Sequence, residues 1–221
     1  MSHLVCNTEK TQRVHVYREG QDWQKNKTLG ALMGEEQDVT RRMQLAGLAF
    51  RRMFGLFAGV SASLELKIRV WNALVRPVVL YGRGIWGLNA TMTEKLCALH
   101  RRHLRILAGY RWPKRIRNEA LYRLTKSRPL SLDIQQSRLR LLGHCLSMPT
   151  DTPAQLALSV TVNTSLKGRR GRPPKCLLSR LRTDMDKVGL NMRNMKGLEE
   201  LRKHAADKHQ WEETIEHICS A

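Results

Sequence analysis

Acidic side chains are scarce in this chain of 221 residues. It has 19 Asp and Glu residues against 39 Lys and Arg residues, and its formal net charge at neutral pH is +20. A small domain remains soluble with a net charge of roughly 2–8 in magnitude. An excess of this size attracts anions over long distances. The composition therefore predicts a polyanionic partner.

Long apolar runs and paired cysteines are also missing. No stretch approaches the roughly 20 apolar residues that a membrane span needs, and residues 1–13 lack the apolar core of a signal peptide. The five cysteines are odd in number and widely spaced, which indicates reduced thiols inside the cell. No Gly-rich loop has phosphate-binding spacing, and no grouping of Ser, Cys and His suggests nucleophilic catalysis. We expect no cofactor and no membrane partner.

The positive charge is concentrated in the middle of the chain. Residues 61–150 have 17 basic and 4 acidic side chains, whereas residues 1–60 have 9 and 6 and residues 151–221 have 13 and 9. Between positions 101 and 128, ten basic residues accompany the single acid Glu119. A solvated face normally mixes charges of both signs, so this stretch predicts contact with nucleic acid. The contacts that we predict here are Arg101, Arg102, Arg105, Arg111, Lys114, Arg115 and Arg117.

Aromatic residues make up only 5% of the chain, but three of them lie within this basic stretch. Tyr110, Trp112 and Tyr122 alternate with the cations. Aromatic rings beside basic residues can stack on unpaired bases. They can equally fill gaps in a hydrophobic core, and the sequence leaves both roles open.

The N-terminal part of the chain suggests a small β-hairpin. Residues 13–17 alternate between polar and apolar side chains, which is typical of a half-buried strand. Residues 28–30 suggest a second short strand after a turn. We expect these two segments to pair.

Helical spacing begins near residue 37. Apolar residues recur every three or four positions through residues 37–57 and again through residues 64–79, where Pro77 should bend or end the helix. A third helix should cover residues 93–107, with Thr93 as its N-cap. Because each apolar stripe needs a partner, the three helices should pack as a bundle. The predicted fold is therefore mainly α-helical.

Further helices should follow the bundle. The predicted ranges are 118–124, 132–146, 175–188 and 198–218. The expected organisation is an N-terminal part with the hairpin, a helical bundle, a basic helical extension, a flexible basic linker and C-terminal helices. These parts are predicted to cover residues 1–34, 35–110, 111–150, 151–175 and 176–221, respectively.

The linker contains the run KGRRGRPPK at residues 167–175. Glycine removes side-chain bulk, proline fixes an extended backbone, and such a strand with flanking arginines fits a narrow, negative groove. The core RGRP, residues 170–173, resembles an AT-hook, which binds the minor groove of A·T-rich DNA. A solvated basic linker is the alternative interpretation. The nucleic-acid contacts predicted in this run are Arg169, Arg170, Arg172 and Lys175.

Several short motifs follow one another along nearly the whole chain, from Asn7 to Trp211. They are NTEKT at 7–11, TLG at 28–30, RPVVLYG at 76–82 followed by Trp86, LRILAG at 104–109, RNEALY at 117–122, RLRLLGH at 138–144, GRRGRPPK at 168–175 and the pair Asp207 and Trp211. Read in this order, they resemble the C-terminal half of reverse transcriptases from non-LTR (LINE-type) retrotransposons. Each motif is weak alone, but their order and spacing are specific.

The resemblance implies that residues 1–34 are a palm-edge remnant and that residues 35–110 form a three-helix thumb-like bundle. It also implies a basic tail that grips RNA template and DNA. It also has departures. The family holds two metal ions with adjacent palm aspartates, and this chain contains no Asp-Asp pair. Arg83 and Gly84 stand where the family has Ser and Glu. Lys10 matches the palm lysine that lies near the nucleotide phosphates, but here it has no metal site, and a surface lysine is the simpler interpretation.

One His and Cys grouping could suggest a metal site. Cys97, His100 and His103 fall three residues apart on one predicted helix. Cys97 and His103 are almost two helical turns apart and do not point in the same direction. Zinc usually takes four ligands in paired short spacings. We therefore expect packing or solvent exposure for these residues, and no metal site.

The sequence thus predicts a non-enzymatic, nucleic-acid-binding fragment of a LINE-type reverse transcriptase, with RNA and DNA as partners and a nuclear location. It should contact phosphates with little sequence preference. An architectural DNA-binding protein that uses the AT-hook-like run is one alternative. A non-functional retroelement relic is another.

Overall fold

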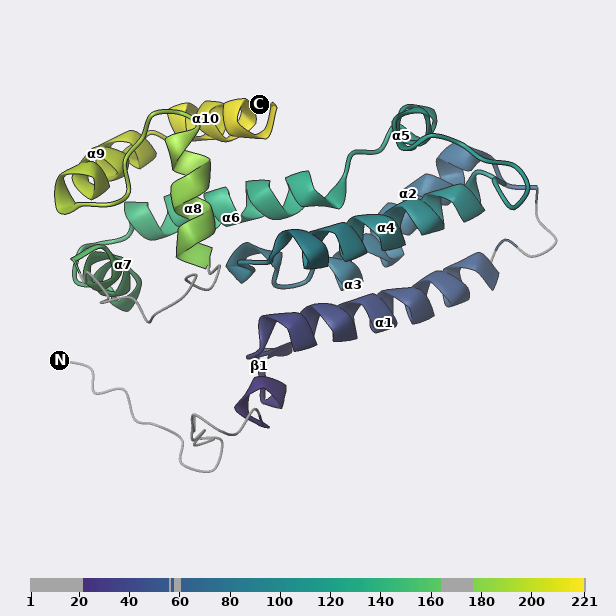
Figure 1. The fold of residues 1–221 in the computed structure, drawn as a ribbon, viewed down its shortest axis with the longest axis horizontal. Coiled ribbons are helices and arrows are strands. Elements are labelled where there is room, and N and C mark those ends of the chain that lie inside the picture. The colour runs from purple at the N-terminus through teal and green to yellow at the C-terminus, as the bar shows by residue number, and fades with distance from the viewer. Residues whose placement is uncertain (1–21, 56, 58–60, 164–176, 221) are drawn as a thin grey trace.

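The computed structural model describes residues 22–55, 57, 61–163 and 177–220. Within these residues the chain is mainly helical, with a short antiparallel hairpin before the helices, as the sequence predicted. Figure 1 shows an elongated arrangement in which the N-terminal helices lie toward one end and the C-terminal helices toward the other.

The hairpin differs in detail from the prediction. Strand β1 (Lys27–Thr28) pairs with β2 (Ala31–Leu32), after the short 3-10 helix η2 (Asp22–Lys25). Leu29 and Gly30 have φ values of 49° and 85°, as the two central residues of a type I′ hairpin turn require. The prediction of a strand at residues 28–30 was therefore wrong at its last two positions. The predicted partner strand, residues 13–17, lies outside the described residues.

Helix α1 (Glu35–Gly55) and helix α2 (Leu64–Leu74) follow the predicted apolar stripes. Along α1 the fully buried apolar residues are Val39, Ala46, Phe50 and Met53. α2 ends before Pro77, which lies in the first turn of the short helix α3 (Arg76–Val79). Proline fits a first turn because no intrahelical partner is needed for its missing N–H group. The predicted interruption of this helix is confirmed.

Helix α4 (Ala90–Leu107) begins three residues earlier than predicted. Its N-cap is Asn89, whose Oδ1 accepts a hydrogen bond of 2.8 Å from the backbone N–H of Met92. Thr93, the predicted cap, lies inside the first turn, where its hydroxyl donates to the Asn89 carbonyl oxygen at 3.0 Å. The 3-10 helix η3 (Arg83–Ile85) joins α3 to this region. α1, α2 and α4 pack on one another around the buried Trp71 and Trp86.

The remaining helices are α5 (Asn118–Thr125), α6 (Leu130–Ser147), α7 (Pro153–Asn163), α8 (Leu177–Asp186), α9 (Met195–Ala206) and α10 (Lys208–Ser220). The prediction of one helix over residues 198–218 was wrong, because Asp207 leaves the helical conformation at φ −89° and ψ 108°. Its carboxylate then accepts hydrogen bonds from the backbone N–H groups of His209 (2.8 Å) and Gln210 (3.3 Å) and so begins α10.

Helix α6 connects two hydrophobic cores. Leu130 and Ile134 belong to the first core, which α1, α2 and α4 also build. Leu139, Leu142 and Leu146 belong to the second, with residues from α7 to α10. The change from one core to the other thus falls inside a helix. The predicted linker at residues 151–175 differs from this arrangement, since α7 forms its first part.

Two close contacts hold the C-terminal helices on α6. A buried ion pair joins Arg138 of α6 to Asp184 of α8, and Gln135 donates a hydrogen bond of 2.9 Å to the same carboxylate. On α10, the Nε1–H of Trp211 donates to the carbonyl oxygen of Leu139 at 3.2 Å. The Trp211 ring lies so close to Gly143 that a Cβ atom there would be 2.2 Å from Nε1.

Candidate nucleic-acid interface

The basic stretch predicted from the sequence begins in the second half of α4 and ends in the segment before α6. It includes the loop between α4 and α5, α5 itself and residues 126–128. Figure 1 shows α5 and this loop at the end of the molecule that lies away from α9 and α10. The structure therefore brings the loop and α5, which carry five of the ten cations of this stretch, to one end of the fold.

The three arginines of α4 differ in their surroundings. Arg101 is half-buried and forms an ion pair with Glu94, which lies almost two helical turns earlier on α4. Arg105 donates a hydrogen bond of 2.6 Å to Asn118 Oδ1, a neutral partner. Arg102 is exposed. Arg101 thus carries a neutralised charge and is the weakest phosphate ligand of the three.

The loop after α4 has exposed cations, and its backbone is held in place by a hydrogen bond and by core packing. The backbone turns at Lys114, whose N–H donates to the Arg111 carbonyl oxygen at 2.8 Å, and Ile116 packs against the first core. The exposed basic residues of the loop are Arg111, Lys114, Arg115 and Arg117. Over the described part of the chain, none of these four has an ion-pair partner, so their charges are available to phosphates.

The aromatic residues of this stretch divide between the two roles that the sequence left open. Tyr122 packs against the first core, with its ring centroid 5.9 Å from that of His100. Trp112 is 85% exposed in the loop beside Arg111. Tyr110 is half-buried. Trp112 is therefore the side chain of this group that is positioned to stack on a base.

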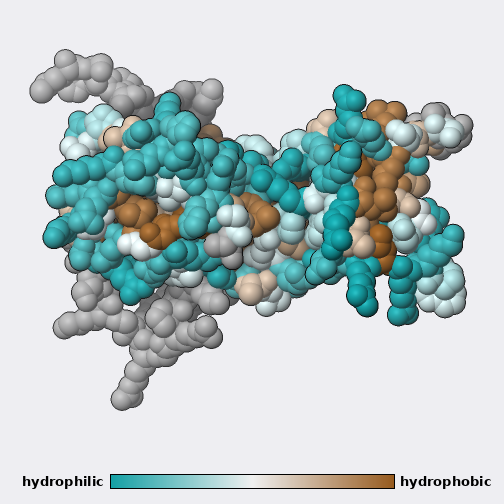
Figure 2. All heavy atoms as spheres, turned by 90° about the horizontal axis from the view of Figure 1, so that it is seen from above, coloured by the Kyte–Doolittle hydropathy of each residue, from teal (hydrophilic) through white to brown (hydrophobic). Residues whose placement is uncertain are grey.

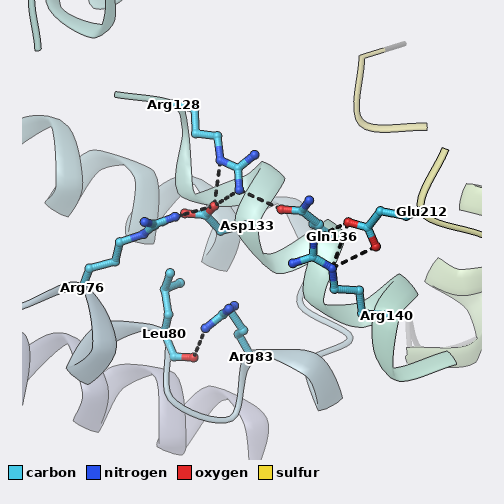
Figure 3. Close-up of polar contacts among 8 residues, drawn as sticks. All are labelled: Arg76, Leu80, Arg83, Arg128, Asp133, Gln136, Arg140 and Glu212. Carbon is cyan, nitrogen blue, oxygen red and sulfur yellow. Dashed lines mark hydrogen bonds and ion pairs between the residues drawn. The ribbon is translucent and has the colours of Figure 1, made fainter. Parts of the chain in front are cut away.

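The last cations of the stretch are partly neutralised. Arg123 and Glu119 are both strongly exposed and 3.8 Å apart on α5, where solvent weakens such a pair. Arg128 instead donates to Asp133 Oδ1 (2.9 Å from Nε) and to Gln136 Oε1 (2.7 Å from Nη2). Figure 3 shows Arg76 reaching the same Asp133 carboxylate from the other side. The Asp133 carboxylate of α6 therefore links Arg128, in the segment before α6, to Arg76 of α3.

Figure 2 shows the molecule from above, and hydrophilic side chains cover most of this face. Hydrophobic side chains are exposed in smaller areas; Leu66 and Leu74 of α2 and Leu124 of α5 are between 45% and 48% exposed. Nucleic-acid interfaces are more polar and more positively charged than interfaces between proteins. The four exposed cations of the loop after α4 give the surface this charge, beside a hydrophobic area that Figure 2 shows toward the same end of the molecule.

Some predicted site residues lie outside the described residues. They are Lys10 and the four cations Arg169, Arg170, Arg172 and Lys175.

The His and Cys residues of α4 belong to the core. His100 stacks on Trp71 with ring centroids 4.6 Å apart, and His103 stacks on Phe50 at 3.9 Å. Burial lowers the pKa of both imidazoles to about 4. Cys97 is also buried. The prediction of packing is confirmed, and no group of potential metal ligands occurs in the part of the chain that the structure describes.

A second group of arginines comes together only in the folded chain. Arg76, Arg83, Arg128 and Arg140 come from separate segments and line one cavity. Arg76 and Arg140 are 64 positions apart in the sequence, so no local motif predicts that these arginines lie together. Arg83 stood out only as a departure from the reverse-transcriptase pattern.

Comparison of the chain with known protein families, with curated proteins and with solved structures found no match. Across the described residues, no helix combines the length and apolar character that crossing a membrane would require.

Proposed function

We propose that this chain binds nucleic acid through a basic surface at the end of the fold that carries α5. The basic surface consists of Arg102, Arg105, Arg111, Lys114, Arg115, Arg117 and Trp112. The observation that carries the proposal is the loop between α4 and α5. It presents four exposed cations that have no ion-pair partner in the described residues, next to a tryptophan that is 85% exposed.

The chemistry of this surface suits phosphates and unpaired bases. Arg and Lys neutralise backbone phosphates and release condensed counterions, which gives affinity with little sequence preference. An exposed indole ring adds stacking worth about 1–3 kcal/mol per base. Since stacking needs an accessible base face, the surface favours single-stranded RNA or DNA over duplex.

We further propose that the chain corresponds to the thumb and tail of a LINE-type reverse transcriptase, acting in the nucleus. Two contacts support this resemblance because each joins segments that carry it. Tyr81 contacts Leu29, and Trp211 packs on Gly143. The chain contains no Asp-Asp pair to hold catalytic metal ions. It therefore binds nucleic acid without polymerising it, and primer extension with Mg²⁺ or Mn²⁺ should give no product.

The proposal is tested by removing the loop cations together. A variant with Arg111, Lys114, Arg115 and Arg117 all changed to Gln should lose at least ~100-fold in affinity for a fluorescein-labelled single strand, measured by anisotropy at 100 mM salt. The matched control changes four exposed lysines of the C-terminal half, Lys187, Lys196, Lys203 and Lys208, to Gln.

Both variants lower the net charge by four, so they separate a local site from a general attraction. The control should keep affinity within about three-fold of the parent protein. Equal losses in the two variants would show that the net charge alone attracts the strand, and the proposed surface would then be wrong.

A further inference from the structure

A cavity of about 300 Å³ lies between α3, η3 and α6. Its size falls at the lower end of the range for small-ligand sites, roughly 300–1,000 Å³. Arg76 of α3, Arg83 of η3, Arg140 of α6 and Arg128 from the segment before α6 line it. Figure 3 shows these four side chains around the same space, entering from different elements.

The charges around this cavity are unbalanced. Asp133 is the only acidic side chain among the described residues that line it, and it is 4% exposed. Its carboxylate is shared between Arg76 (2.8 Å from Nη2 to Oδ1) and Arg128 (2.9 Å from Nε to Oδ1). Four arginines against one aspartate leave three uncompensated positive charges. Glu212 pairs with Arg140 from outside the lining and reduces the excess to two.

Arg83 has the least satisfied side chain of the four. Its one hydrogen bond among the described residues is a long one of 3.5 Å, from Nη1 to the carbonyl oxygen of Leu80. Its Nε is buried and has no acceptor in the described part of the chain. A guanidinium group has five N–H donors and stays charged at any physiological pH. A buried donor without an acceptor costs free energy. Because Arg83 as a whole is only half-buried, its other donors are free to bind an anion in the cavity.

We propose that this cavity binds a phosphate group. Arginine forks match the oxygen geometry of phosphate and bind it in bidentate fashion. Ser137, which also lines the cavity, adds a hydroxyl donor. A phosphate carries enough negative charge to balance the excess that Asp133 and Glu212 leave. The site is separate from the basic surface and goes beyond the function proposed above.

The phosphate group can come from a nucleic-acid strand or from a small phosphate compound. Inorganic phosphate is the probe that both sources share. Because a ligand that binds only the folded state raises the melting temperature, the first arm compares phosphate with chloride at equal ionic strength. At ten times its dissociation constant, phosphate should raise the melting temperature of the parent protein by about 3 °C or more.

The key variant is Arg83→Gln, with Arg123→Gln as its control. Arg123 is exposed on α5 outside the cavity, and among the described residues its ion-pair partner is Glu119 at 3.8 Å. Both substitutions remove one positive charge. Arg123→Gln should keep the phosphate-induced shift and Arg83→Gln should lose most of it. An equal shift in the two variants, or no difference between phosphate and chloride in the parent protein, would overturn the proposal.

A second variant tests the cavity independently, in case Arg83→Gln fails to fold. Ser137→Glu leaves every arginine in place and puts a carboxylate into the cavity, and it should abolish the shift in the same way. Retention of the full shift in this variant contradicts the site.

The second arm identifies the source of the phosphate. If a strand occupies the cavity, Arg83→Gln should weaken the binding of a single-stranded oligonucleotide by about ten-fold. If a small compound does, oligonucleotide affinity should stay within two-fold while the phosphate shift is lost. The variant with four substitutions in the loop after α4 should keep the phosphate shift, so failure of the basic surface and failure of this cavity give different results.

Discussion

The hydroxyl of Tyr81 donates a hydrogen bond of 2.6 Å to the carbonyl oxygen of Leu29, which lies 52 positions earlier in the chain. Leu29 is the first central residue of the hairpin turn, and Tyr81 follows α3. The guanidinium of Arg42 lies 4.3 Å above the Tyr81 ring and also donates to the carbonyl oxygen of Gly30. Tyr81 and Arg42 therefore both link the hairpin turn to the helical bundle.

The substitution Tyr81→Phe tests this contact. It keeps the ring under Arg42 and removes only the hydrogen bond. The free energy of unfolding should fall by about 0.5–1.5 kcal/mol, measured by urea denaturation. Tyr110→Phe is the control, because no hydrogen bond from the Tyr110 hydroxyl is present among the described residues. A loss in the control as large as that in Tyr81→Phe would contradict the assignment.

Gly143 should tolerate no side chain. A Cβ at this position would meet Trp211 Nε1 at 2.2 Å and Cδ1 at 2.6 Å. Alanine favours a helix over glycine by about 1 kcal/mol, but the clash forces α10 away from α6. Gly143→Ala should therefore destabilise the protein by about 1–3 kcal/mol.

Gly47, on α1, is the matched control for this substitution because no atom lies within 4 Å of its would-be Cβ. Gly47→Ala should leave stability unchanged or raise it slightly in the same thermal or urea denaturation. A neutral Gly143→Ala variant would mean that Trp211 does not pack on this position.

The stability of the first core should depend on pH. Burial lowers the pKa of His100 and His103 to about 4 from the ordinary value of 6.5, and the Asp133 charge opposes this only in part at His100. The unfolded chain thus takes up protons more readily. The stability is complete above about pH 6.5 and falls as the pH drops from 6.5 toward 4, by about 1.4 kcal/mol per unit for each histidine.

Urea denaturation at pH 7.5 and pH 5.0 measures this loss. His103 should contribute because its Nδ1 accepts the Trp71 indole N–H at 3.2 Å, which a protonated ring cannot do. His103→Gln should reduce the pH dependence by about half. His144 and His217 are exposed, so their Gln variants should retain the full dependence. Identical stability of the parent protein at the two pH values would refute the burial of neutral histidines.

The run at residues 167–175 gives a separate prediction from the sequence. If it inserts into a minor groove, changing Arg170 and Arg172 to Ala should weaken binding to A·T-rich duplex selectively. We expect instead an equal and small loss on A·T-rich DNA, G·C-rich DNA and RNA, as a phosphate contact would give. Competition binding with the three ligands measures the difference, and a loss confined to A·T-rich duplex would restore the AT-hook interpretation.

The helices of the first bundle could be predicted because their apolar residues recur with a helical period. The sequence of α7, PAQLALSVTVN, is apolar on most sides and has no polar stripe, so periodicity gave no signal there. The break between α9 and α10 depends on one side chain, Asp207, whose capping bonds replace a helical turn. The division into two cores escaped prediction because α6 contributes to both.

The positive charge of the candidate site could be predicted from the sequence, but which of its residues are exposed and unpaired could not. Net charge located the basic stretch, but the pairing of Arg101 with Glu94 and of Arg128 with Asp133 depends on how the helices fold and pack. Sequence spacing alone could not separate the exposed loop cations from these paired ones. Sequence spacing also could not separate Trp112 from Tyr122, because only the folded chain shows which of the two rings packs against the hydrophobic core.

The salt dependence of binding tests the central proposal most directly. With labelled single-stranded RNA and DNA, the parent protein should lose about 10³–10⁵-fold in affinity between 50 and 200 mM salt if it neutralises roughly 6–10 phosphates. The variant with Gln at positions 111, 114, 115 and 117 should have a logarithmic slope shallower by about 3, and the variant with Gln at 187, 196, 203 and 208 should keep the parent slope. A flat salt response in the parent protein, or the same slope in all three proteins, would contradict nucleic-acid binding at this surface.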